Sequence, residues 1–205
     1  MKISKFLLSR RDLMRKGGAL SAGLAALALP GFPRAAEPLK ATMPAAVPGS
    51  TALPGAGKDV DILNTGLSLE HQIIASYQMS IDSGILQNLA LNIAMLFQSH
   101  HKAHRDAVAA AVQKLGGTPV ASQSAAEYGA ALGVSTLKSQ NDILQLALKL
   151  ELASANAYLG FTGMITDKDY AKLAARVAAD DVMHWTALAS TLSQPLPANP
   201  LTFGA

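Results

Sequence analysis

The chain has 205 residues, of which 50% are hydrophobic, 15% charged and 5% aromatic, so it can bury the core of one ordinary domain. Few aromatics and frequent Ala and Leu favour helices over sheets. Because seven basic residues and one acidic residue lie in residues 1–36, the net charge changes from +3 to −3 without them, and the high pI is no argument for nucleic acid as a partner. The sequence contains no cysteine, which excludes disulfides, thiolate metal ligands and a lipoprotein anchor.

Residues 1–36 are typical of an export signal. Basic residues precede a weakly apolar run from Gly17 to Leu29, which is too short for a convincing membrane span. The basic part contains Ser9-Arg10-Arg11-Asp12-Leu13-Met14 and resembles a twin-arginine signal, in which Ser-Arg-Arg-x is followed by two apolar residues. An ordinary secretory signal with a chance arginine pair is the alternative.

The resemblance to a twin-arginine signal implies the twin-arginine export machinery as a partner and a periplasmic or otherwise exported location. No stable membrane span is expected after the signal is cleaved. Arg34 lies before Ala35 and Ala36, where a small residue is preferred for cleavage, so an uncleaved anchor is a second interpretation.

The next segment, residues 37–58, is predicted to be a flexible Pro/Ala-rich spacer because it has four prolines and no amphipathic period. The folded domain is expected to begin near Asp59. From there the sequence predicts a helix, because residues at alternating steps of three and four form one continuous, mostly apolar seam along a helix face. These residues are Val60, Leu63, Leu67, Glu70, Ile74, Tyr77 and Ile81.

A break at Asp82-Ser83-Gly84 separates this helix from a second one, which is predicted to end at Gly116-Gly117-Thr118-Pro119. The seam of the second helix is Phe97, His101, His104, Val108, Ala111 and Leu115. The segment from Gly116 to about Leu137 is too long for a tight turn. It is therefore predicted to be a crossover with a short helix around Ala125 to Leu132.

Two further helices are predicted after the crossover. The seam of the third is Leu144, Leu148, Glu151, Ala155 and Tyr158, and that of the fourth is Tyr170, Ala174, Val177, Asp181, His184 and Leu188. Thr166-Asp167 is expected to link the two and cap the fourth helix. Residues 195–205 contain three prolines and are predicted to form an irregular tail. Two helical hairpins joined by a longer crossover indicate an all-α four-helix bundle over residues 59–194.

A polar pattern occurs twice in these seams, at an offset of 80 or 81 residues. In each half a glutamate precedes a tyrosine by seven positions. A ligand-type residue follows later, and a histidine comes three places after it. The members are Glu70, Tyr77, His101 and His104 in the first half and Glu151, Tyr158, Asp181 and His184 in the second. Burying an isolated carboxylate or imidazole is costly. Either metal coordination or mutual ion pairing in a metal-free bundle would offset this cost, and the repeat favours metal.

With this pattern the chain resembles the ferritin-like superfamily over roughly Asp59 to Leu192. Dinuclear sites of that superfamily use one Glu from each of two helices and Glu-x-x-His from each of the other two. By position, Glu70 and Glu151 match the lone glutamates, His104 and His184 match the motif histidines, and His101 and Asp181 stand where the family normally has Glu. Tyr77 and Tyr158 match tyrosines found one heptad after the lone glutamates in several such proteins. They are expected either to support the site or to serve only as packing residues.

The family implies iron, but the departure at His101 leaves three carboxylates and three imidazoles. A nitrogen-richer site makes manganese, zinc and copper candidates as well. A register using Gln98 and His101 is less favoured, because it would carry Arg105 into the seam. His71 and His100 are expected either to be solvated or to support the metal ligands without binding metal themselves. Asp180 is expected to face outward, and Trp185 is expected to be a packing or interface residue.

The leading functional hypothesis is an exported metal-binding protein, with a dinuclear-metal redox activity (oxidase, ferroxidase or peroxide-handling) as the activity that the resemblance implies. The alternative is a non-enzymatic envelope or stress-related interaction protein with a metal-free bundle. A mineral-storing cage, which requires a homo-oligomer, has weaker support. No nucleotide loop, haem-ligand pair or substrate motif is present in the sequence.

Overall fold

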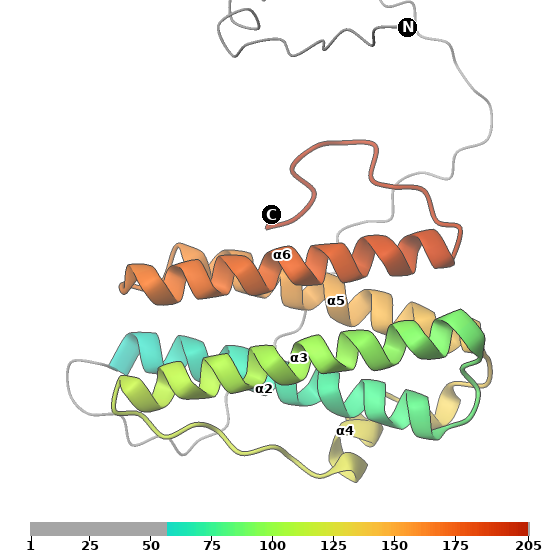
Figure 1. Ribbon diagram of the computed structural model, residues 1–205, viewed down its shortest axis with the longest axis horizontal. Helices are drawn as coiled ribbons and strands as arrows, with labels where there is room; N and C mark the ends of the chain where they lie inside the picture. The colour runs from blue at the N-terminus through green and yellow to red at the C-terminus, as the bar shows by residue number, and fades with distance from the viewer. Residues whose placement is uncertain (1–56, 205) are drawn as a thin grey trace, which may run out of the picture. The chain divides into compact units, whose positions relative to one another are not determined.

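A computed structural model describes residues 57–204 of the chain. All regular elements in this range are helices (Figure 1): α2 (Gly57–Asp82), α3 (Asn88–Lys114), α4 (Ala125–Ala131), the 3-10 helix η1 (Val134–Thr136), α5 (Gln140–Thr162) and α6 (Lys168–Thr191). Within residues 57–204 no helix is both long enough and apolar enough to span a bilayer. The predicted export signal and nearly all of the predicted spacer lie outside the described residues, and the last two spacer residues, Gly57 and Lys58, already belong to α2.

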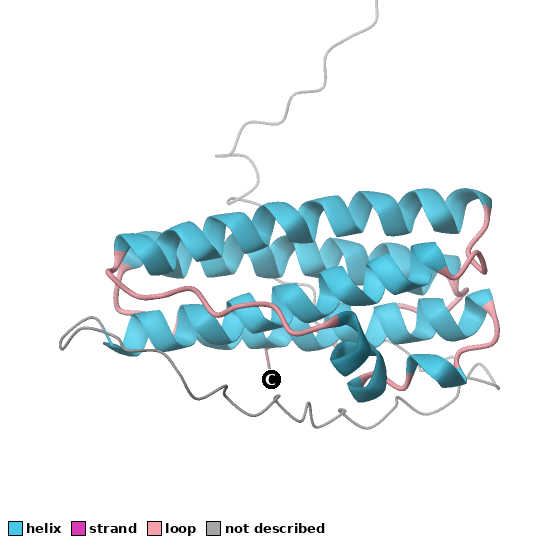
Figure 2. Cartoon of the chain, turned by 90° about the horizontal axis from the view of Figure 1, so that it is seen from below, coloured by secondary structure: helices cyan, strands magenta, loops and turns pink. Residues whose placement is uncertain are grey.

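The four long helices form two hairpins, α2 with α3 and α5 with α6, and this confirms the predicted all-α bundle. The hairpins pack on each other through α2 against α5 and through α3 against α6. Helix α4 lies in the crossover and contacts α2, and Figure 2 shows the crossover running along the outside of the bundle. The contacts within each hairpin are more extensive than those between hairpins, and the contact between α3 and α6 is the sparsest among the long neighbouring helices.

The helix ends follow local rules. Gly84 adopts φ +67° in the turn after α2, a conformation that disfavours other residues, and the predicted break falls there. Asp167 caps α6 as predicted, because its carboxylate accepts hydrogen bonds from the backbone N–H groups of Asp169 (2.8 Å) and Tyr170 (3.3 Å). The short crossover helix also forms where it was predicted, at Ala125–Ala131.

The crossover is held against α2 by side-chain contacts. The Asn64 amide donates to the Thr118 carbonyl (3.1 Å), and its oxygen accepts from the Val120 N–H (2.9 Å). A Cβ at Gly117 would lie 2.5 Å from Val60 Cγ1, so only glycine lets the chain pass this close to α2. The connection between the hairpins is therefore fixed to the bundle along the first helix.

The apolar core is divided into two halves along the bundle. One half includes Leu63, Leu67, Val108, Val112, Phe161, Ala174 and Val177. The other includes Ile73, Phe97, Leu144, Leu148, Trp185 and Leu188. Each of the four long helices contributes one stretch of residues to each half of the core. The predicted metal ligands lie between these two stretches on every helix. A polar layer thus separates two apolar cores.

Candidate metal centre

The structure brings together all six residues that the sequence singled out as metal ligands. Helix α2 contributes Glu70, α5 contributes Glu151, and α3 and α6 each contribute a pair at i and i+3, which is the spacing that places two side chains on one helix face. Five of the six are 0% exposed, and His104 is 8% exposed; the five are Glu70, His101, Glu151, Asp181 and His184.

His101 lies at the middle of this cluster. Its Nδ1 is 2.8 Å from Glu70 Oε2 and its Nε2 is 3.1 Å from Glu151 Oε1. Burial by itself would lower the pKa of His101, but the carboxylates of Glu151 and Glu70 outweigh burial and raise that pKa well above its ordinary value. Without a metal, His101 is therefore an imidazolium that donates to one glutamate from each hairpin.

Glu151 is the best-satisfied carboxylate of the cluster. Besides His101, it contacts His184, whose Nδ1 lies 3.2 Å from Oε2. Burial would raise the pKa of Glu151, but the neighbouring imidazoles of His101 and His184 lower it to about 2. Ion pairing therefore accounts for one side of the cluster without any metal.

The other side of the cluster is less completely compensated. Glu70 Oε1, His104 Nδ1 and both carboxylate oxygens of Asp181 are buried and have no hydrogen-bond partner. Burial raises the pKa of Asp181 well above its ordinary value; the charge of His101 opposes this effect, and the charges of Glu151 and Glu70 add to it. Four ligand-type atoms thus lie together with their hydrogen-bonding capacity unused, which is uncommon in a protein interior.

The donor atoms are close enough to share metal ions. They form two groups, one of Glu70, His101 and His104 and the other of His101, Glu151, Asp181 and His184, and within each group one atom per residue lies within 4.8 Å of the others. Ligand atoms on opposite sides of one ion are about 4.2 Å apart, since bonds to N or O are about 2.0–2.2 Å long. Movements of a few tenths of an ångström would satisfy that limit, so the residues fit a metal centre.

The two tyrosines contact the cluster unequally. Tyr77 on α2 donates a 2.6 Å hydrogen bond to Oε1 of Glu151 on α5, in the opposite hairpin. Tyr158, its counterpart in the repeat, is also buried, but its hydroxyl has no hydrogen-bond partner. Burial raises the pKa of both phenols, with Glu151 adding to the effect for Tyr77 and Glu70 for Tyr158. Both hydroxyls are therefore protonated at neutral pH.

Two residues outside the predicted set contact the cluster. Nε2 of His104 lies 3.1 Å from Oδ2 of Asp180, and Nε2 of His184 lies 2.8 Å from Nδ1 of His100. Asp180 faces outward as predicted, and His100 supports the cluster from behind, one of its two predicted roles. The repeat contained a signal for both residues, because His100 and Asp180 are themselves related by the offset of 80.

The remaining polar candidates lie away from the cluster. His71 contacts a crossover carbonyl through Nε2 at 3.1 Å. Gln98 is buried, but its amide donates to Gln78 (2.9 Å) and to a carbonyl of α2, so the register using Gln98 is not the one that the structure has. Trp185 packs edge-on against Phe203 of the C-terminal tail, with ring centroids 5.3 Å apart.

Fold and site together define a helical bundle with a buried cluster of carboxylates and imidazoles. A family model described as a ferritin-like domain matches residues 58–194, and the chain belongs to this family. Among solved structures, a conserved hypothetical protein from Mycobacterium tuberculosis is similar, with a TM-score of 0.58, 21% identity, and coverage of 69% of this chain and 96% of that chain. At this identity the similarity supports the fold alone. A comparison with curated proteins finds no match.

Proposed function

We propose that the chain is an exported metal-binding protein whose buried cluster holds one or two metal ions in a redox centre. The observation that carries this proposal is the set of four buried ligand-type atoms without partners on Glu70, His104 and Asp181. Each buried polar group left unsatisfied costs about 1–3 kcal/mol, and a charged group costs more. A cation in the first ligand group would satisfy Glu70 and His104, and a cation in the second would satisfy Asp181.

His101 has a special place in the proposed centre, because it is the one member shared by both ligand groups and directs one ring nitrogen toward each. Glu70 and His104 would complete the first group, and Glu151, Asp181 and His184 the second. The Tyr77 hydroxyl holds Glu151 in place from across the bundle. Iron is favoured by the family, while three imidazole donors also suit manganese, zinc or copper.

The proposed activity is oxidation chemistry with a small oxidant, as an oxidase, a ferroxidase or a peroxide-handling protein. A redox-active metal would supply the electron transfer when bound. The chain itself supplies a water-poor interior between two apolar core halves and keeps two protonated phenols beside the ligands. Export in the folded state by the twin-arginine route would allow the metal to be inserted before the membrane is crossed.

A second candidate function is a metal-free envelope or stress-related interaction protein. One observation favours it: His101 already pairs with Glu70 and Glu151, so half of the cluster is compensated without metal. This candidate predicts that metal changes neither the composition nor the stability of the protein.

Metal content measured by mass spectrometry separates the two candidates. Protein purified from its native compartment is compared with the variant Glu70→Gln plus Glu151→Gln and with the control Asp61→Asn plus Asp106→Asn, which removes two exposed carboxylates instead. We expect at least one equivalent of iron, manganese, zinc or copper in the native protein and the control, and none in the glutamine variant. A metal-free native protein whose melting temperature does not respond to any of these ions would overturn the proposal.

A further inference from the structure

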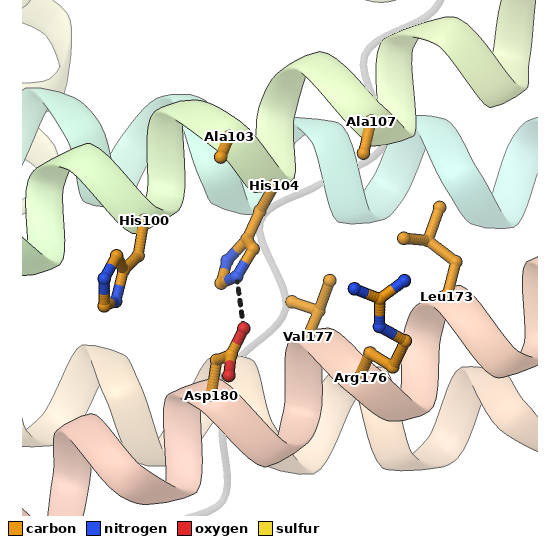
Figure 3. Close-up of a pocket in the computed structure, with 8 residues that line it drawn as sticks. All are labelled: His100, Ala103, His104, Ala107, Leu173, Arg176, Val177 and Asp180. Carbon is orange, nitrogen blue, oxygen red and sulfur yellow. Dashed lines mark hydrogen bonds and ion pairs between the residues drawn. The ribbon is translucent and has the colours of Figure 1, made fainter.

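One member of the cluster reaches the surface. His104 is 8% exposed, whereas the other five are 0% exposed. The exposed part of His104 lines a pocket of about 340 Å³ between α3 and α6, the two neighbouring long helices with the sparsest contact (Figure 3). Access from water to the cluster is therefore most direct at this pocket.

The pocket is open because α3 carries small side chains there. Ala103 and Ala107 line its α3 side, and Leu173, Arg176 and Asp180 line its α6 side. One water occupies about 30 Å³ of liquid, so the volume admits an ion together with several of its waters. Of the residues that line the pocket, His104 is the one that belongs to the six-residue cluster, and His100, which also lines it, contacts His184 of the cluster.

The His104 ring has one nitrogen on each side of that boundary. Nε2 lies 3.1 Å from Oδ2 of Asp180, whose side chain is 51% exposed. Nδ1 has no hydrogen-bond partner and lies 3.8 Å from Oε2 of Glu70 and 3.9 Å from Oδ1 of Asp181. Carboxylate and imidazole groups that can bind a metal ion therefore extend from the pocket into the cluster.

We propose that this pocket is the port through which hydrated divalent cations reach the buried cluster. Asp180 is the first carboxylate that an entering cation meets, and His104 is the ligand between the port and the centre. Arg176 lies one helical turn from Asp180 and is exposed, so its positive charge opposes cation entry and limits the rate. The port rests on the proposed metal-binding function and adds the route by which the metal enters.

The first test fills the port. Chelated protein is mixed with Co²⁺ in a stopped-flow spectrometer, and both the rate of uptake and the final number of bound ions are measured. Ala107→Phe places a ring in the mouth, while the control Ala110→Phe makes the same change at an exposed position of α3 outside the pocket. We expect Ala107→Phe to slow uptake about tenfold or more relative to the control, at an unchanged final stoichiometry.

The second test changes the charge of the port without adding bulk. We expect Asp180→Asn to slow Co²⁺ uptake about twofold and Arg176→Glu to speed it about fourfold at low salt, and both differences to shrink at high salt. The controls Asp61→Asn and Lys149→Glu carry the same charge changes on α2 and α5, away from the pocket, and should leave the rate unchanged.

The outcomes separate the port from the centre. Equal uptake rates for Ala107→Phe and Ala110→Phe, together with charge variants that match their controls, would overturn the port while leaving the centre in place. A wild-type protein that takes up no Co²⁺ would remove the proposed centre, and the port with it. If Ala107→Phe does not fold, the two charge variants decide.

Discussion

Replacing Asp181 with asparagine tests whether the metal-free cluster is under strain from an unsatisfied carboxylate. Asp181 is 0% exposed, and neither of its oxygens has a hydrogen-bond partner. Its Oδ1 lies 3.9 Å from His104 Nδ1 and 4.0 Å from His184 Nδ1. Asparagine keeps the size of the side chain, carries no charge and offers an N–H donor toward His104 Nδ1. We therefore expect Asp181→Asn to stabilise the metal-free protein.

The size of the effect follows from the unsatisfied group. A buried unsatisfied polar group costs about 1–3 kcal/mol, so a gain of about 1–2 kcal/mol is expected at pH 7. In a domain of this size that gain corresponds to a rise in melting temperature of about 3–8 °C. Because the pKa of Asp181 is raised in the folded state, ionisation of this group costs nothing below its ordinary pKa and costs progressively more as the pH rises. The part of the advantage of Asp181→Asn that comes from ionisation should therefore disappear toward pH 4.

Urea unfolding of chelated protein at pH 7 and pH 4 measures this difference, with Asp61→Asn as a control for the loss of one exposed carboxylate. Adding Co²⁺ should make the wild type the more stable of the two, since it binds the ion through the Asp181 carboxylate, which the variant lacks. If metal-free Asp181→Asn is less stable than the wild type at pH 7, Asp181 has a favourable partner without metal, and the argument from unsatisfied oxygens is wrong.

Three further substitutions test the surroundings of the cluster by urea unfolding. Tyr77→Phe removes the 2.6 Å hydrogen bond to Glu151 and should cost about 1.5–3 kcal/mol, whereas Tyr158→Phe, whose hydroxyl has no partner, should change stability by less than about 0.5 kcal/mol; equal costs would contradict the observed asymmetry. Gly66→Ala brings a Cβ to 2.9 Å from the Tyr158 hydroxyl and should lower the free energy of unfolding by about 1–3 kcal/mol. The loss should be smaller when Tyr158→Phe is also present, and an unchanged loss would show that another contact is responsible. Asp167→Ala removes the cap of α6 and should cost about 0.5–2 kcal/mol, and no loss would mean that the cap is dispensable.

The sequence by itself was enough to predict the four long helices and the six residues that meet between them. Residues three and four apart lie on one helix face, so an apolar seam interrupted by polar groups specifies which side chains enter a bundle. The prediction is less accurate at one position of the first helix. The predicted seam contains Ile74, but Ile73 is the buried residue, at 2% exposure, and it packs in the core half that includes Phe97 and Leu144.

Contacts between the hairpins were decided only by the tertiary structure. The sequence repeat relates Tyr77 to Tyr158, yet Tyr77 bonds to Glu151 while the Tyr158 hydroxyl has no partner. Spacing within one helix does not specify how far that helix is shifted along its neighbour, since the shift depends on how all the side chains of both helices pack. The same packing places His104 beside Asp180 and leaves a pocket between α3 and α6 that His104 lines.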